Sequence, residues 1–358
     1  MRALGAGRAV LAFDVGGTDM KAALVDEAGD IRDIVRVPTP IHGELIDGEP
    51  VDGEPVDGEP VDGEPVVGEP VDGAHMDGDP IDGEQMDGEK TAGAVVIRIG
   101  QLARDLQKNH PDVHPQGAGL LVPGHVDDEG GVGLFSENLG WKNYPFRDRV
   151  EAVLRVSVSL GHDVRGAGEA EYRLGAAEPF RDVVVMVIGT GIAGAVFIQG
   201  TLYTGGGMAG EVGHSKVADG PQCACGGLGC LEAVASAGAI ARRYTQVSGQ
   251  VVSGAKDVLE RAASGDIAAR QIWEGALDAL ALDLSHTVAL LAPEAIVIGG
   301  GLSQAGSVLF EPLERRLDAM LTFQRRPRLL RASIGADAGV IGAALRARDL
   351  LDKKAGDP

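Results

Sequence analysis

The chain has 358 residues and is short of positive charge. It holds 32 lysines and arginines against 53 aspartates and glutamates, which gives a formal net charge of -21. Nucleic acids and anionic membrane surfaces are bound through clustered basic side chains. The charge balance therefore argues against both as partners and favours small molecules.

Long apolar runs are also missing. Near the N-terminus, the apolar run 9–13 meets Asp14 too early to be the core of a signal peptide. The uncharged segment 183–207 is divided by Gly189 and Gly191 into two runs rich in β-branched residues. A membrane-spanning helix needs ~20 consecutive apolar residues, so this segment predicts two short strands instead. We expect a cytoplasmic protein with no membrane partner.

A five-residue phrase, EPVDG, repeats with growing variation over residues 44–90. The segment 41–90 holds 17 acidic residues and one lysine, so most of the net charge belongs to it. With little apolar surface and recurrent proline, it cannot offset its ordering entropy by burial. We predict a disordered surface insertion over 44–90. A solenoid or a calcium-binding tract is the alternative, although the carboxylates lack the spacing of a calcium loop. The flanking residues read as a strand end and an amphipathic helix.

Three glycine-rich turns each follow an apolar, strand-like run, and the chain has no GxxxxGK[ST] phosphate loop. The first turn could be an ordinary hairpin or a cradle for an anion, and the third precedes a predicted helix. Each turn alone is a weak signal, but together they predict a nucleotide site between two domains. The turns are Gly16, Gly17 and Thr18; Gly189, Thr190 and Gly191; and Gly299, Gly300 and Gly301.

All three cysteines lie close to one histidine in the sequence. Zinc favours four nitrogen or sulfur ligands in a tetrahedron, and glycines at 226, 227 and 229 let the loop fold its thiolates onto one point. A disulfide is the alternative, but it would leave one cysteine unpaired in a chain expected to be cytoplasmic. We predict a structural zinc site, because four protein ligands leave no open position for water or substrate. Its ligands would be His214, Cys223, Cys225 and Cys230.

These residues resemble the ROK family of sugar kinases and repressors, within the actin-like and hexokinase-like ATPase superfamily. The resemblance spans almost all of the chain except 44–90, and it implies the same zinc ligands. It also implies an α/β fold of two actin-like domains, a duplicated ribonuclease H-like motif with ATP and sugar in the cleft between them. We expect residues 1–167 with 338–358 to form the smaller domain and 168–337 the larger one. The matching stretches are DVGGTDMK, GLLVPGHVD, SENLGW, GHDVRGAGEAEYRLGA, GTGIAG, GEVGH, CACGGLGCLE, IVIGGG and GVIGAAL.

The resemblance favours a kinase over a repressor. Family repressors carry a DNA-binding domain before the DVGGT hairpin, and only thirteen residues precede Asp14 here. The GHDVR and NLGW forms most resemble glucokinases, which implies ATP-dependent phosphorylation of the glucose 6-hydroxyl. Kinases for fructose, mannose or N-acetylmannosamine stay as alternatives, as does a sugar sensor without catalysis. The family also implies a homodimer or homotetramer.

Phosphoryl transfer to a hydroxyl needs alignment, Mg²⁺ and a carboxylate that accepts the hydroxyl proton. The resemblance gives the last role to Asp163, for which a helix N-cap is the local alternative. It implies that Asp14 orients Mg²⁺ and that the three glycine turns hold ATP, with the third at the adenosine. Lys21 either supports the phosphates or is a solvated strand lysine. The implied sugar contacts are Asn138, His162, Asp163, Glu211, His214 and Glu232.

The chain departs from the usual family form beside Asp163. That form has asparagine immediately before the aspartate and again two residues after it, where this chain has His162 and Arg165. A histidine can still donate a hydrogen bond to a sugar hydroxyl, whereas we expect Arg165 only to cap or pair locally. The residues beside Asp163 therefore indicate the reaction more closely than the identity of the sugar.

Overall fold

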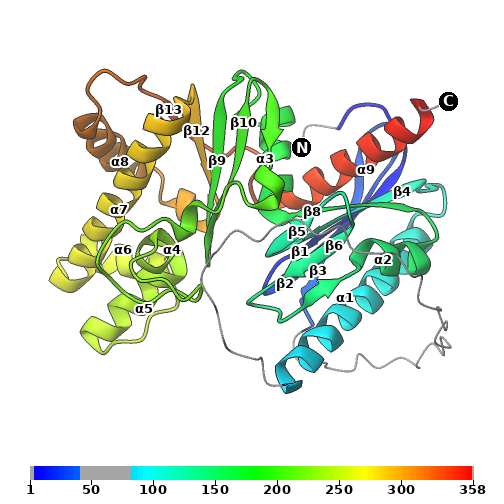
Figure 1. Ribbon diagram of the computed structural model, residues 1–358, viewed down its shortest axis with the longest axis horizontal. Helices are drawn as coiled ribbons and strands as arrows, with labels where there is room; N and C mark the ends of the chain where they lie inside the picture. Colours follow the sequence, from blue (N-terminus) through cyan, green and yellow to red (C-terminus); the bar gives the residue numbers. More distant parts are fainter. Residues whose placement is uncertain (1–3, 41–81, 357–358) are drawn as a thin grey trace, which may run out of the picture.

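The computed structural model describes residues 4–40 and 82–356, with side chains from Gly88 onward in the second range. Two five-stranded sheets stand on either side of two helices, α3 (Asp163–Leu174) and α9 (Ala338–Gly356) (Figure 1). Each sheet carries further helices on its outer face. Segments from both halves of the chain therefore meet at the centre of the molecule.

The first sheet combines an antiparallel hairpin with a parallel half. β1 and β2 form the predicted hairpin around the first glycine turn, and β1, β4 and β8 run parallel. Alternate residues of β1 face opposite layers: α1 (Asp82–Asn109) and α2 (Phe146–Leu154) cover one face, and α9 covers the other. The order is β3 (Ile31–Pro38), β2 (Asp19–Val25), β1 (Val10–Val15), β4 (Gly117–Val122) and β8 (Ser157–His162).

The second sheet repeats this topology. β9 and β10, the two strands predicted within 183–207, are antiparallel, whereas β9, β12 and β13 are parallel. The order is β11 (Thr201–Tyr203), β10 (Ile192–Ile198), β9 (Val183–Ile188), β12 (Ala295–Gly299) and β13 (Arg328–Arg331). The outer helices are α4 (Leu231–Ala235), α5 (Ala237–Ser248), α6 (Ala255–Ala263), α7 (Ile267–Leu291) and α8 (Ser307–Met320). On its inner face, Phe197 stacks on Tyr172 of α3 with ring centroids 4.2 Å apart.

Smaller elements complete the fold. A three-stranded sheet is formed by β5 (His125–Asp127), β6 (Val132–Phe135) and β7 (Lys142–Tyr144). Short 3₁₀ helices are η1 (Gly205–Gly207), η2 (Val212–His214), η3 (Gly301–Ala305) and η4 (Gly335–Asp337).

The two central helices cross at glycines. A Cβ atom at Gly342 of α9 would lie 2.0 Å from the carbonyl oxygen of Gly166 in α3. A Cβ atom at Gly166 would in turn lie 2.3 Å from a methyl group of Leu121 in β4. Only glycine lets the backbones approach this closely, and the contact fixes α3 against the first sheet.

The structure corrects one boundary of the predicted insertion. Residues 41–81, which hold most of it, lie outside the described residues, but α1 already begins at Asp82 and includes 82–90. Pro80 is the last proline of the repeat, so residues 82–90 no longer oppose a helix. Gly88 is buried against the turn between β6 and β7, where its Cβ would lie 1.8 Å from Gly140 O. This packing contact supports the first turns of the helix.

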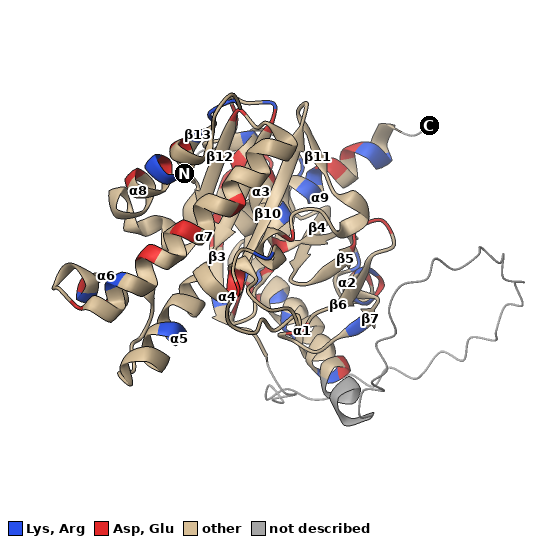
Figure 2. Cartoon of the chain, turned by 60° about the vertical axis from the view of Figure 1, so that its left-hand side comes forward, with Lys and Arg blue, Asp and Glu red and all other residues tan. Residues whose placement is uncertain are grey.

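The described surface carries both signs of charge. Figure 2 shows Lys and Arg interspersed with Asp and Glu along α6, α7, α8 and α9. Among the described residues, no helix combines the length and the apolar character needed to cross a bilayer.

Candidate functional site

The parallel strands of the first sheet bring two carboxylates to one edge. Asp14 in β1 lies opposite Leu121 in β4, which in turn lies opposite Gly161 in β8. Asp163 follows β8 as the first residue of α3, at the carboxyl end of the strand as predicted. Both carboxylates line one cavity of about 250 Å³, which residues of the second sheet close from the other side. This is the strand edge at which α/β sheets bind ligands.

Burial raises the pKa of both carboxyl groups. The pKa of Asp163 rises to about 7, chiefly through burial, with a further contribution from the charge of Glu211. That of Asp14 rises to about 6 for the same main reason, and Lys21 opposes the rise. Their side chains keep 25% and 15% exposure, toward the cavity they line. Two carboxylates with raised pKa values favour either a bound cation or proton exchange near neutral pH.

Lys21 lines the same cavity. Its Nζ lies 3.6 Å from Asp14 Oδ2 and donates a hydrogen bond to Ala336 O, just before α9. With 15% exposure, this side chain belongs to the cavity and is not a solvated strand lysine. The first residues of α9 line the cavity as well. A lysine and a helix N-terminus facing one space favour an anionic ligand.

Asp14 is in contact with the start of α9. A Cβ atom on Gly339 would lie 2.1 Å from Asp14 Oδ2. Glycine at 339 therefore allows the carboxylate to occupy its position in the cavity.

The three glycine turns differ in their relation to this cavity. Gly299 and Gly300 line it, and Gly300 needs to be glycine because its φ is +77° and a Cβ would lie 2.4 Å from Ile188 O. At Gly17, Gly189 and Gly301 an added Cβ would meet nothing within 4 Å, so protein packing does not require glycine there. At these three glycines the backbone is open to the approach of a ligand. Apart from Gly299 and Gly300, the residues of the three turns lie outside the cavity lining.

Among the other predicted sugar contacts, Glu211 is the one that acts on Asp163. Glu211 lies close enough to raise the pKa of Asp163, and it is 4.0 Å from His214 Nε2. Glu232 lies in the first turn of α4 and accepts a hydrogen bond of 2.8 Å from Ile192 N, so it is fixed against the second glycine turn. Asn138 lies in the exposed turn between β6 and β7.

The four predicted zinc ligands converge. The ligand atoms of His214, Cys223, Cys225 and Cys230 all lie within 4.8 Å of one another, although nine residues separate His214 from the first cysteine. The Cys225 and Cys230 sulfurs are 3.7 Å apart, far beyond the ~2.05 Å of a disulfide. Tetrahedral zinc with Zn–S bonds of ~2.3 Å requires sulfurs ~3.8 Å apart, so the spacing fits a metal.

The chemistry of these donors also fits zinc. Without a metal, burial and the neighbouring sulfurs raise the pKa of Cys230 to about 12, which opposes the thiolate form. A cation among the sulfurs would relieve this cost. His214 turns Nδ1 toward Cys223, 3.7 Å away, and Nε2 toward Glu211. If Nδ1 ligates zinc, Nε2 stays on the side of Glu211.

The predicted sugar contact His162 lies directly beside Asp163 and bonds within the chain. Its Nδ1 accepts a hydrogen bond of 3.4 Å from Arg165 N, and its Nε2 lies 3.3 Å from Asp163 Oδ1. Burial lowers its pKa to about 4, so the ring is neutral at pH 7. Both ring nitrogens thus face groups of the chain, and one of these groups is the carboxylate of Asp163. His162, rather than Asp163, is the N-cap of α3.

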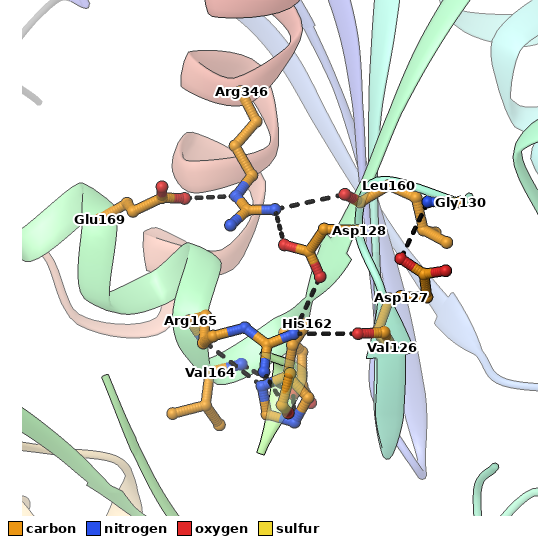
Figure 3. Close-up of polar contacts among 12 residues, drawn as sticks. Val126, Asp127, Asp128, Gly130, Leu160, His162, Val164, Arg165, Glu169 and Arg346 are labelled. Atoms are coloured by element: carbon orange, nitrogen blue, oxygen red, sulfur yellow. Dashed lines mark hydrogen bonds and ion pairs between the residues drawn. The ribbon is translucent and has the colours of Figure 1, made fainter. Parts of the chain in front are cut away.

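Arg165 does not pair locally, contrary to expectation. Its guanidinium is 1% exposed and lies 2.9 Å from Asp128 Oδ1, 37 residues away in sequence (Figure 3). It also lies 2.9 Å from Gly207 O, 42 residues away. Asp128 also accepts a hydrogen bond of 2.7 Å from Arg346 of α9. Arg346 in turn binds Glu169 and the carbonyl oxygen of Leu160. Two arginines, Arg165 and Arg346, and two carboxylates, those of Asp128 and Glu169, therefore form a charged frame around the junction of β8 and α3.

Sequence reasoning missed most of this frame. Asp128 follows the GHVD stretch and Arg346 follows GVIGAAL, but neither motif indicates a partner for its charge. It also missed Glu171, which is 2% exposed and accepts hydrogen bonds from Ser333 N and Ile334 N. Glu171 thereby ties α3 to the segment before α9. The available signal was the charge of these residues amid the glycines and alanines of α3 and α9, which does not specify a partner.

The sequence pattern of the ROK family matches residues 79–349. The chain belongs to the ROK family. This ROK protein is 36% identical over 244 residues to a glucokinase of Thermotoga maritima, a match that covers 63% of the chain and 77% of that enzyme. It is 29% identical over 345 residues to an N-acetylmannosamine kinase of Escherichia coli O1:K1, with 94% and 98% covered. The structure of a ROK glucokinase from Streptomyces griseus in complex with glucose and AMPPNP superimposes with a TM-score of 0.71 at 26% identity, covering 95% of this chain and 99% of that one. The predicted actin-like α/β fold is confirmed.

Proposed function

We propose that this ROK protein is an ATP-dependent sugar kinase that phosphorylates the 6-hydroxyl of glucose. The observation that carries the proposal is the cavity shared by Asp163, Asp14 and Lys21, with Glu211 adjoining it. The likeness to glucokinases and to an N-acetylmannosamine kinase supports a sugar as the phosphoryl acceptor.

Asp163 is the proposed general base. Its carboxylate accepts the proton of the sugar hydroxyl as the new oxygen–phosphorus bond forms, while the bond from the γ-phosphorus to ADP breaks. A base works best when its pKa is near the working pH, and burial brings Asp163 to about 7. The contact with His162 limits where the carboxylate can point.

The sugar is held by polar side chains around Asp163. Glu211, Glu232, Asn138 and Nε2 of His214 are the proposed partners of its hydroxyl groups. Such contacts discriminate between sugars, because an epimer directs one hydroxyl the opposite way and leaves a polar group of the protein unpaired. Closure of residues 168–337 onto 1–167 and 338–358 would then exclude water from the transfer.

The nucleotide would occupy the remaining part of the cleft. Lys21, the start of α9 and the first two glycine turns are the proposed phosphate contacts, and residues 299–301 the proposed adenosine contacts. The positions of Lys21, Ala338, Gly339, Gly299 and Gly300 in the cavity lining support this assignment. Mg²⁺ would neutralise the charge that develops on the phosphates. Asp14 fits as its anchor, because a nearby cation would relieve the burial that raises the pKa of this carboxyl. Zinc on His214 and the three cysteines would be structural, with the loop holding Glu211 and Glu232 in place.

The experiment is an assay of sugar-dependent ADP release with glucose, mannose, fructose and N-acetylmannosamine. We expect the highest kcat/KM with glucose and a product phosphorylated at the 6-hydroxyl. Asp163→Ala should lower kcat by about 100-fold or more, while Asp105→Asn, at an exposed position of α1, should leave it unchanged.

Other outcomes have defined meanings. A preference for N-acetylmannosamine would replace glucose as the substrate, and no sugar-dependent ADP release with any of the four sugars would indicate a sensor instead of a kinase. An Asp163→Ala protein within about tenfold of wild type would reject the base, since proton transfer is worth more than that.

A further inference from the structure

One arginine joins the two halves of the chain beside the proposed sugar site. Arg165 is in α3 and binds Asp128, which directly follows β5 in the first half. Its other terminal nitrogen, Nη1, donates to Gly207 O of η1 in the second half. Its Nη2 also lies 3.5 Å from Val126 O in β5. The guanidinium thus lies between β5 and η1.

The segment 205–211, which Arg165 contacts, is rich in glycine and therefore has high backbone conformational freedom. Gly205, Gly206, Gly207 and Gly210 all have positive φ, and Gly205 and Gly206 are exposed. Glycine loses more backbone entropy on ordering than any other residue. This segment leads directly into Glu211, so its position sets where that carboxylate lies.

Other contacts fix the end of this segment. Gly210 O accepts a hydrogen bond of 2.7 Å from Gly194 N of β10. Near its middle, the backbone of η1 lies against β5, where a Cβ on Gly207 would be 2.9 Å from Val126 O. The hydrogen bond from Arg165 lies at this midpoint and links it to the first half of the chain.

The anchor of Arg165 is rigid. Asp128 is held from its second oxygen by Arg346, which is also bound to Glu169 and to Leu160 O. Figure 3 shows that these side chains come from α3, α9 and the end of β5, around the strand that ends at His162. The tether therefore joins the segment 205–211 to the same frame that positions Asp163.

We propose that Arg165 is a positioning residue that holds the segment 205–211 against β5, so that Glu211 meets the sugar beside Asp163 and sugar affinity is high. This inference rests on the proposed kinase function. Arginine suits the task because its planar fork can donate to Asp128 and Gly207 O at once, whereas the single ammonium group of lysine cannot reproduce that geometry.

The test is Arg165→Lys, which keeps a buried cation for Asp128 and so limits the cost of an unpaired charge. We expect the KM for the sugar to rise about 10- to 100-fold, the effect of losing a hydrogen bond to a charged group. The kcat and the KM for ATP should stay within about threefold, because Asp163 and the phosphate side keep their own contacts. Amide hydrogen exchange of residues 205–211 should become faster in the variant without any ligand.

Arg173→Lys is the matched control. Arg173 is also in α3, but it pairs with Asp349 at the surface, so neither the sugar KM nor the exchange of 205–211 should change. Arg165→Gln provides a neutral second variant that should show the same direction in both measurements.

Three results would overturn the inference: an unchanged sugar KM in folded Arg165→Lys, an equal loss in kcat and in both KM values, or unchanged exchange at 205–211. A wild-type protein that phosphorylates no hexose would refute the proposed function separately, and the exchange measurement would still decide whether Arg165 tethers the segment.

Discussion

The ionised carboxylate of Asp163 should lower the stability of the folded protein, and a variant without this negative charge should be more stable. In Asp163→Asn, the amide oxygen can still accept the hydrogen bond of 2.7 Å from Val164 N, but the buried negative charge is gone. We therefore expect the inactive variant to be more stable than wild type at alkaline pH. Active sites commonly trade stability for function in this way.

The magnitude follows from the pKa. Moving it from 3.8 to about 7 means that the folded state binds the proton more tightly than the unfolded chain does. The ionised form thus destabilises the fold by up to about 4 kcal/mol above pH 7. Because the side chain keeps 25% exposure to water, about 1–3 kcal/mol is the expected gain. The cost falls as the pH drops from about 7 toward 4, where folded and unfolded chains are both protonated.

The assay is urea unfolding of wild type and Asp163→Asn at pH 8 and pH 5, without nucleotide or magnesium. The variant should have the higher midpoint at pH 8, and the difference should shrink by about half or more at pH 5. Asp105→Asn should show no such dependence, since that side chain is exposed. A less stable Asp163→Asn at pH 8, or a difference independent of pH, would refute the reasoning.

Two further predictions concern the nucleotide and the metal. Gly339→Ala should lower kcat/KM for Mg²⁺–ATP by about tenfold or more, because the added methyl group displaces Asp14. Gly356→Ala is the control in the same helix, and its kcat/KM should stay unchanged because the space around Gly356 is open. Equal kinetics of the two variants would show that the Gly339 contact is unimportant. The wild-type protein should contain one zinc ion per chain by elemental analysis. The Cys225→Ser variant should lose this zinc, unfold at a lower temperature and bind sugar more weakly. Full sugar affinity in a verified zinc-free variant would contradict the structural role of the metal.

Local patterns predicted the parts of the site that lie close together in sequence. The strand before Asp163 and the helix after it follow from an apolar run, a polar cap and a helical run within a few residues. The hairpin around Gly16 and the strands on either side of Gly189 are equally local. The convergence of His214 with the cysteines was predictable because zinc chemistry prescribes the ligand number and geometry.

The interactions that were missed depend on distant partners. Arg165 meets Asp128 across 37 residues, and Arg346 meets Asp128 across 218. A charged residue in a sequence does not show which opposite charge the fold brings to it, so a solvated or local role was the default expectation for Arg165. The burial of His162 was likewise not predictable, because it results from the packing around the junction of β8 and α3.

The α9 helix has a consequence for biosynthesis. It supplies Gly339 beside Asp14 and Arg346 at the frame, and it covers an apolar face of the first sheet. Every other described element leaves the ribosome before α9 does. Until α9 has been synthesised, the nascent chain exposes an apolar face of the first sheet and lacks an assembled catalytic centre. Premature termination would therefore yield an inactive product that chaperones or proteases recognise.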